Sequence, residues 1–231
     1  GDTVLDVGCG RGQSSVLLAS RYQVQVVSVD LWIDSEERRR KAESAGVDAL
    51  ITPLHGDIGR GVPIAPGSLK AIFCMQSFHS FGTRGWLVRY LASLLEPGGK
   101  IAIAQGCFRE EVEVLPPPFT DTDGWNAEYR NYHSPPWWLD HFASSGEFSV
   151  VSGGEVMDGD ILWEDDVLYR CELHGWSPAY LARSSWLIRQ ILHGRTAPPS
   201  LTHCMVVATK HCAGAGRHAV PPPPRDVVRG G

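Results

Sequence analysis

The stretch Thr3–Asp30, TVLDVGCGRGQSSVLLASRYQVQVVSVD, decides how the rest of this 231-residue chain is interpreted. A run of β-forming residues, Thr3–Val7, leads into a glycine cluster and then into apolar residues at helical spacing. A second apolar run, Val24–Val29, ends at the acid Asp30, about 20 residues beyond the glycines. This order predicts strand, glycine turn, helix and strand, with a carboxylate at the tip of the second strand.

The residue types of this unit suit a ligand that contains a nucleoside. Glycines let the backbone approach a ligand closely, and a carboxylate at the strand tip can accept hydrogen bonds from both hydroxyls of a ribose. The glycines Gly8, Gly10 and Gly12 run G-x-G-x-G, which departs from the dinucleotide fingerprint G-x-G-x-x-G. The preceding acid, Asp6, would repel a pyrophosphate but suits a ligand with a positive amine and a sulfonium.

The segment Asp6–Gly12, DVGCGRG, resembles motif I of the class I S-adenosylmethionine (SAM) dependent methyltransferases. A second hallmark of that superfamily, the turn Glu96–Gly99, precedes the apolar run Lys100–Gln105. The resemblance implies an α/β, Rossmann-like fold: a mostly parallel seven-stranded sheet with helices on both faces and an antiparallel last strand. The patterns D-L-W, F-H-S-F-G and H-S-P-x-W-W resemble a bacterial branch that methylates small molecules, without naming a substrate.

The resemblance implies SAM as the cofactor and a set of residues that bind it. In that superfamily the acid at the position of Asp30 binds the ribose, Leu31 or Trp32 would lie against the adenine, and Asp57 would accept the adenine amino group. The alternatives are a loop hydrophobe packed on the next helix for Leu31 or Trp32, and an Asx turn for Asp57. The expected cofactor-binding residues are Asp6, Gly8, Gly10, Gly12, Asp30, Leu31, Trp32, Asp57, Ile58 and Gln76.

Two histidines are candidates for a general base. Methyl transfer from a sulfonium is an in-line displacement in which alignment does most of the work, so a base is optional. His79 is the first candidate, because it is the only titratable side chain in the segment that follows the strand Leu69–Met75. His133 is the second. The alternative for both is a histidine that only shapes the wall of the pocket.

Composition favours a small-molecule partner. The net charge of −5 and the pI near 6.0 offer no basic surface for nucleic acid or an anionic membrane, and no apolar run is long enough to span a bilayer. The six scattered cysteines indicate reduced thiols in a cytoplasmic protein. We expect no metal site at the pairs His203-Cys204 and His211-Cys212. The run Arg38–Lys41 is interpreted as a solvated helix face.

The domain organisation is simple. Residues 1–210 are expected to form one methyltransferase domain, with an insertion at about 107–133 that could serve as a lid, and residues 211–231 a disordered tail. The chain begins directly at the first strand, so we expect a fragment that lacks the helices usually preceding it.

The leading hypothesis is methyl transfer to O, N or C of a small organic acceptor; the alternatives are a SAM-binding scaffold or a SAM-assisted enzyme of another kind. The sequence leaves the oligomeric state open.

The remaining elements are read from periodicity and turn residues. The expected strands are Asp48–Leu54, Leu69–Met75, Lys100–Gln105, Phe148–Val151 and Leu201–Lys210, and the expected helices are Glu36–Ala45, Arg84–Leu95, Ser134–Ser145 and Ala179–Leu192.

Overall fold

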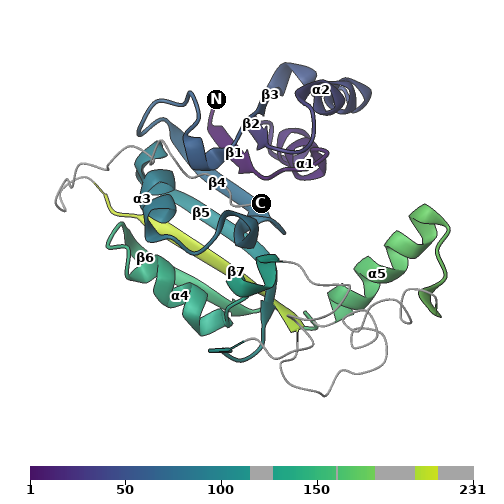
Figure 1. The fold of residues 1–231 in the computed structure, drawn as a ribbon. Coiled ribbons are helices and arrows are strands. Elements are labelled where there is room, and N and C mark those ends of the chain that lie inside the picture. The colour runs from purple at the N-terminus through teal and green to yellow at the C-terminus, as the bar shows by residue number, and fades with distance from the viewer. Residues whose placement is uncertain (115–126, 160, 180–200, 213–231) are drawn as a thin grey trace.

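The fold is known from a computed structural model, which describes residues 1–114, 127–159, 161–179 and 201–212. These residues form one sheet in the order β3-β2-β1-β4-β5-β7-β6 (Figure 1). Strands β1 to β5 pair in parallel, whereas β7 runs antiparallel to both β5 and β6. The predicted fold class is therefore confirmed. The strands are β1 Thr3–Val7, β2 Gln25–Asp30, β3 Ile51–His55, β4 Leu69–Met75, β5 Leu95–Phe108, β6 Phe148–Glu155 and β7 Leu201–Lys210.

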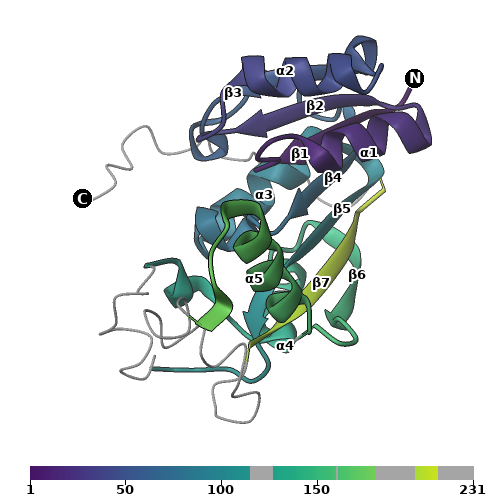
Figure 2. The same ribbon diagram turned by 90° about the vertical axis from the view of Figure 1, so that its right-hand side faces the viewer.

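Helices cover both faces of the sheet (Figures 1 and 2). Successive side chains of a strand point to opposite faces, so Val4 packs with one set of helices and Leu5 with the other. The face of Val4 is covered by α1 and α2, and the face of Leu5 by α3 and α4. The helices are α1 Gln13–Tyr22, α2 Ser35–Ser44, α3 Gly85–Leu94, α4 Pro135–Ala143 and α5 Ile161–His174.

Local sequence signals explain where two of these helices begin. Asp34 caps α2, because its carboxylate accepts a hydrogen bond from the Glu36 N–H at 2.8 Å. Ser134 caps α4, and Pro135 occupies the first helical position, where no backbone donor is needed. Both starts agree with the predicted ones. Short 3-10 turns lie between the longer elements: η1 Asp48–Leu50, η2 Ile58–Arg60, η3 Phe78–Phe81 and η5 Ala127–Asn131.

Three expectations about the elements need correction. Strand β5 is much longer than Lys100–Gln105, because Leu95 already pairs with Leu69 of β4 before the turn and pairing with β7 continues to Phe108. Helix α5 was not expected at all. Arg38 is 2% exposed and not on a solvated face.

Some expectations fall on residues that are not described. The expected helix Ala179–Leu192 lies almost wholly outside the described residues, as do the middle of the insertion and nearly all of the expected tail. None of the described helices is both long and apolar enough to cross a membrane.

Candidate functional site

The glycine loop after β1 is shaped by a close contact with the segment after β4. Gly8 has a φ of 65°, and its N–H donates to the Val29 carbonyl at 2.8 Å. A Cβ added at Gly8 would lie 2.3 Å from the Ser77 hydroxyl oxygen and 3.0 Å from the Phe81 ring. Only glycine satisfies both the backbone conformation and this approach.

A pocket opens beside this loop, at the carboxyl ends of β1 to β4. This is the edge at which ligands bind in parallel α/β sheets. Six predicted cofactor-binding residues line it: Gly8, Asp30, Leu31, Trp32, Asp57 and Ile58. Five further lining residues were not predicted: Val29, Gly56, Ser77, Ser80 and Phe81. Three of these five belong to the segment after β4, in which the sequence predicted only Gln76 as a cofactor-binding residue and His79 as a candidate base.

Asp30 ties together the loops around the pocket. One carboxylate oxygen accepts the backbone N–H groups of Trp32 at 2.8 Å and Ile33 at 2.9 Å, and the other accepts the Gly10 N–H at 2.8 Å. A carboxylate has about four acceptor positions, so one stays open on the oxygen that faces Gly10. One ribose hydroxyl can be accepted as the loops stand, and a second requires the Gly10 N–H to move.

The remaining residues of the predicted cofactor set lie around the pocket without lining it. Asp6 is buried under the glycine loop, where both Ser14 and Ser15 donate to one of its oxygens at 2.6 Å. Its other oxygen is buried and has no partner among the described residues. Burial raises the pKa of Asp6, although the two serine hydroxyls and the nearby Arg38 guanidinium oppose that shift. Asp6 is thus a buried carboxylate with spare acceptor capacity.

Gly12 and Gln76 have supporting positions. Gly12 has a φ of 81° and caps α1, its N–H donating to the Cys9 carbonyl. Gln76 has a φ of 59°, and its side-chain oxygen accepts the Gly106 N–H at 3.1 Å. The Gln76 side chain therefore bridges to β5 and does not line the pocket.

His79 lies in η3, between pocket residues Ser77 and Ser80. It is 7% exposed. Its ring and the Tyr132 ring form an edge-to-face pair with their centroids 4.9 Å apart. Its carbonyl accepts a hydrogen bond from the Asn131 amide at 2.8 Å. The returning end of the insertion therefore packs directly on His79.

His133 belongs to a different arrangement, which we call the Glu111 clasp. The His133 Nδ1 lies 2.7 Å from one oxygen of Glu111, and the Ser134 N–H and hydroxyl both donate to the other oxygen at 2.9 Å. Burial alone would raise the pKa of Glu111, but these hydrogen bonds outweigh it and leave the pKa below its ordinary value. The His133 ring stacks on Trp137 at 3.7 Å. His133 does not line the pocket.

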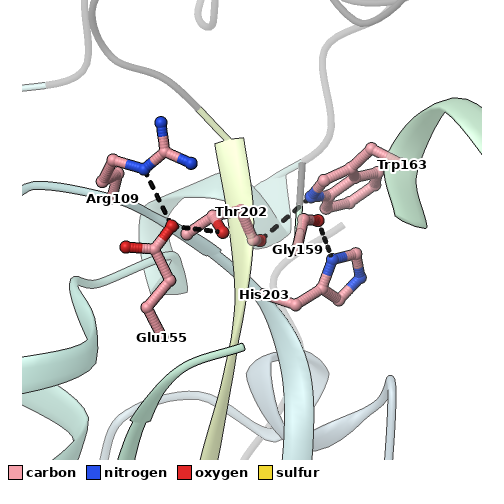
Figure 3. Close-up of polar contacts among 6 residues, drawn as sticks. All are labelled: Arg109, Glu155, Gly159, Trp163, Thr202 and His203. Carbon is pink, nitrogen blue, oxygen red and sulfur yellow. Dashed lines mark hydrogen bonds and ion pairs between the residues drawn. The ribbon is translucent and has the colours of Figure 1, made fainter. Parts of the chain in front are cut away.

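Polar contacts also join the amino-terminal part of β7 to its neighbours (Figure 3). Thr202 donates to Glu155, which also pairs with Arg109, and the Trp163 indole of α5 donates to the Thr202 carbonyl at 3.0 Å. The His203 Nδ1 lies 2.6 Å from the Gly159 carbonyl. Among the described residues, no group of three or more His, Cys, Asp or Glu side chains is placed to hold a metal ion.

Comparison with known proteins gives a family match and several relatives. Residues 4–99 match a family described as a methyltransferase domain. The 27-O-demethylrifamycin SV methyltransferase of Amycolatopsis mediterranei is 29% identical over 104 residues, which are 45% of this chain and 38% of that protein. The chain spans less than two thirds of the length of the first curated relatives that it matches.

Solved structures share the fold over most of the chain. Phosphoethanolamine N-methyltransferase 2 of Haemonchus contortus, solved with SAM, has a TM-score of 0.66 and 18% identity, covering 91% of this chain and 49% of that one. Geranyl diphosphate C-methyltransferase of Streptomyces coelicolor, solved with S-adenosyl-L-homocysteine (SAH), has a TM-score of 0.63 and 20% identity, covering 91% and 72%. Residues 4–99 are thus similar to a methyltransferase domain, and the fold of the chain is similar to that of these two solved methyltransferases.

Proposed function

We propose that this chain binds SAM in the pocket at the strand ends and transfers its methyl group to O, N or C of a small organic acceptor. The observation that carries the proposal is the convergence of the bare backbone of Gly8 with the carboxylates of Asp30 and Asp57 on one pocket. Methyl transfer by the relatives named above supports it, as does the SAM or SAH bound in the two solved structures.

The charges around the pocket fit a cationic cofactor. Asp6 and Asp30 are buried carboxylates, and Arg38 is the buried guanidinium near them. Two negative charges against one positive charge leave a local excess that a bound cation would offset. The unpartnered oxygen of Asp6 is further evidence, because a buried acceptor without a donor is costly unless a ligand or water completes it. The residues present therefore fit SAM.

Each residue of the pocket has a proposed part in binding. Asp30 would accept a ribose hydroxyl, Asp57 the adenine amino group, and Leu31 or Trp32 would lie against the adenine ring. Asp57 already accepts the Gly59 N–H at 2.8 Å through one oxygen, and its other oxygen, which lies 3.9 Å from Nε of Arg60, would accept the ligand. When bound, SAM supplies a methyl group on a positively charged sulfur.

The part closest to the acceptor is assigned to His79. It would take the proton from a hydroxyl acceptor, and the contacts with Tyr132 and Asn131 would hold its ring and backbone in place. His133 stays the second candidate, limited to its Nε2 because Nδ1 faces Glu111. The aromatic residues Tyr129 and Tyr132 from the returning insertion support a lid that covers this end of the site.

The cellular setting is also a proposal. The described cysteines are all free, and five of the six are buried, which supports a reducing, cytoplasmic compartment. We keep residues 1–210 as one methyltransferase domain with a small-molecule acceptor as its partner, and the acidic charge balance argues against nucleic acid.

Calorimetric titration with SAM and SAH tests the cofactor assignment. We expect Asp30→Asn to weaken SAM binding about 10- to 100-fold, because a charge-assisted hydrogen bond is lost and the new amide faces backbone donors. Asp34→Asn is the matched control, since asparagine still caps α2 and the position lies outside the pocket lining. Equal affinities for wild type and Asp30→Asn would remove Asp30 from the site.

Formation of SAH with a mixture of hydroxyl, amine and carbon acceptors tests methyl transfer itself. We expect SAH to form only when an acceptor is present, and His79→Gln to lower turnover at least about 100-fold with little change in SAM affinity. Binding without SAH formation would favour the SAM-binding scaffold or a SAM-assisted reaction of another kind.

A further inference from the structure

Arg38 is the one residue of the Arg38–Lys41 run that is buried. It is 2% exposed, whereas its neighbours Arg39 and Arg40 on α2 lie in solvent and Arg39 pairs with Glu36. Among the described residues, no carboxylate lies within ion-pair distance of the Arg38 guanidinium. A buried guanidinium without a carboxylate partner is costly, and hydrogen bonds from Nη1 and Nη2 offset that cost, whereas Nε has no partner among the described residues.

Those hydrogen bonds join the β2–α2 loop, which lines the pocket, to the end of β3, which leads into another lining loop. Nη1 donates to the carbonyl of Ile33, and Nη2 donates to the carbonyl of Leu54 at 2.6 Å. Ile33 directly follows the lining residues 31 and 32, and Leu54 precedes the lining residues 56 to 58. One rigid fork of donors thus spans from the β2–α2 loop to the end of β3. A lysine ammonium has a different donor geometry and cannot reproduce the fork.

The aliphatic part of Arg38 supports a third segment. Its Cγ and Cδ atoms lie 3.7 and 3.8 Å from the position that a Cβ on Gly12 would take, so the stem of Arg38 lies beside the glycine loop. The guanidinium is also close enough to Asp6 to favour the charged form of that carboxylate. Arg38 therefore lies beside the glycine loop and is hydrogen-bonded to the β2–α2 loop and to the end of β3, without lining the pocket itself.

We propose that Arg38 is a positioning residue that fixes the separation of the β2–α2 loop from the loop after β3, and with it the affinity for the adenosine part of the cofactor. The identity of the ligand rests on the proposed function. The positioning itself is a property of the free protein and can be measured without any ligand.

Hydrogen exchange of the free protein tests the positioning. The amides of Trp32 and Ile33 donate to the Asp30 side chain, and the Gly56 amide donates to the Asp30 carbonyl at 3.0 Å, so their exchange reports the order of both loops. In Arg38→Met, which keeps the length of the stem and removes all donors, we expect these amides to exchange at least about tenfold faster. Amides of β5 should keep their wild-type rates, which shows that the sheet is intact.

Two further variants make the outcome decisive. Arg38→Lys should give an intermediate rate, because an ammonium can reach one carbonyl but not both in the same geometry, and Arg39→Gln should match wild type. If Arg38→Met does not fold, the loop exchange rates of Arg38→Lys decide whether Arg38 positions the two segments. Wild-type exchange rates in the loops of a folded Arg38 variant would overturn the proposal.

Titration with SAM and with 5′-methylthioadenosine tests the consequence for binding. Arg38→Met should weaken both ligands by a similar factor of about ten, because the change lies in the adenosine part that they share. In turnover measurements, KM for SAM should rise while kcat stays near the wild-type value. Faster loop exchange without any loss of affinity would overturn the link to the cofactor. Failure of wild type to bind SAM would instead contradict the proposed function, since the exchange result does not depend on it.

Discussion

Gly8 is the residue at which backbone conformation and access to the pocket depend on the same missing side chain. Its φ of 65° belongs to the left-handed region, and the Ser77 hydroxyl occupies the space of a Cβ. Gly10 has a similar φ of 52°, but no other part of the described structure lies within 4 Å of its Cβ position. The two glycines therefore separate the cost of backbone strain from the cost of steric overlap.

We expect Gly8→Ala to lower the free energy of unfolding by roughly 1–3 kcal/mol more than Gly10→Ala does, because only the first adds overlap to strain. The SAM affinity of Gly8→Ala should also fall at least about tenfold, since Ser77 and Phe81 must shift within the pocket wall. Chemical denaturation and calorimetry of both variants check this. Equal losses in the two variants would show that the contact with Ser77 is unimportant.

At the same scale, the sequence predicted some residues of the site and missed others for a physical reason. Gly8 and Asp30 could be found because their chemistry and spacing are local, within one strand-helix-strand unit. Arg38 could not be found from the sequence, because it stands in a run of charged residues. Its guanidinium is buried against the Leu54 carbonyl of β3, which is distant along the chain. Ser77 was missed in the same way, because its closeness to Gly8 arises from the pairing of β1 with β4.

Among the elements, the Glu111 clasp closes the base of the insertion. Glu111 lies on one side of the insertion and His133 and Ser134 on the other, so three hydrogen bonds hold its two ends together. The lowered pKa of Glu111 means that the carboxylate form is favoured in the folded state. This contribution to stability is present above the ordinary pKa of the carboxyl and is lost as the pH falls through the folded-state pKa.

We expect Glu111→Gln to lower the free energy of unfolding at pH 7 by about 1 kcal/mol, a modest value because the site is partly exposed. The difference from wild type should shrink as the pH falls below the ordinary carboxyl pKa and should disappear below the lowered folded-state pKa, where Glu111 is protonated in the folded wild type too. Thermal unfolding at several pH values measures both effects. Glu110→Gln, at an exposed neighbouring position, is the control. A difference that persists at low pH would contradict the assignment to the charged carboxylate.

Helix α5 shows where the prediction of elements from sequence stops. Trp163, Val167 and Cys171 are spaced by four and form its inward stripe, against Phe108 and Tyr132. The helical spacing of this stripe could not be recognised from the sequence, because Leu168 and Tyr169 are also apolar although they are exposed. Strands that end in turns were predicted well, since glycine and proline mark those turns locally; this helix depends on packing partners from distant parts of the chain.

For the whole molecule, β7 is the strand that connects the parallel part of the sheet to β6. It pairs with β5 from Lys100 to Phe108 on one side and with β6 on the other. Val206 is 1% exposed within the main core, whereas its neighbour Met205 is 46% exposed on the opposite face. This adjacent pair allows the integrity of the sheet to be tested at one place.

We expect Val206→Thr to destabilise the protein by roughly 1–3 kcal/mol, because it buries a hydroxyl in the core, and Met205→Thr to stay within about 0.5 kcal/mol of wild type. If the sheet unfolds as one unit, Val206→Thr should accelerate exchange of the slowest amides in β1 as much as in β6. Faster exchange confined to β6 would mean that the two parts of the sheet open separately.

The position of β7 also has a consequence for how the protein is made. Of the described strands it is the last to leave the ribosome, yet it fills a place inside the sheet, between two strands synthesised earlier. Until residues 201–210 emerge, β5 and β6 each present an unpaired edge to the surroundings, and such edges recruit strands from other chains. A nascent chain halted before Leu201 would therefore be prone to aggregate along the unpaired edges of both β5 and β6. Chaperone demand and aggregation should peak just before residues 201–210 emerge and fall when β7 inserts.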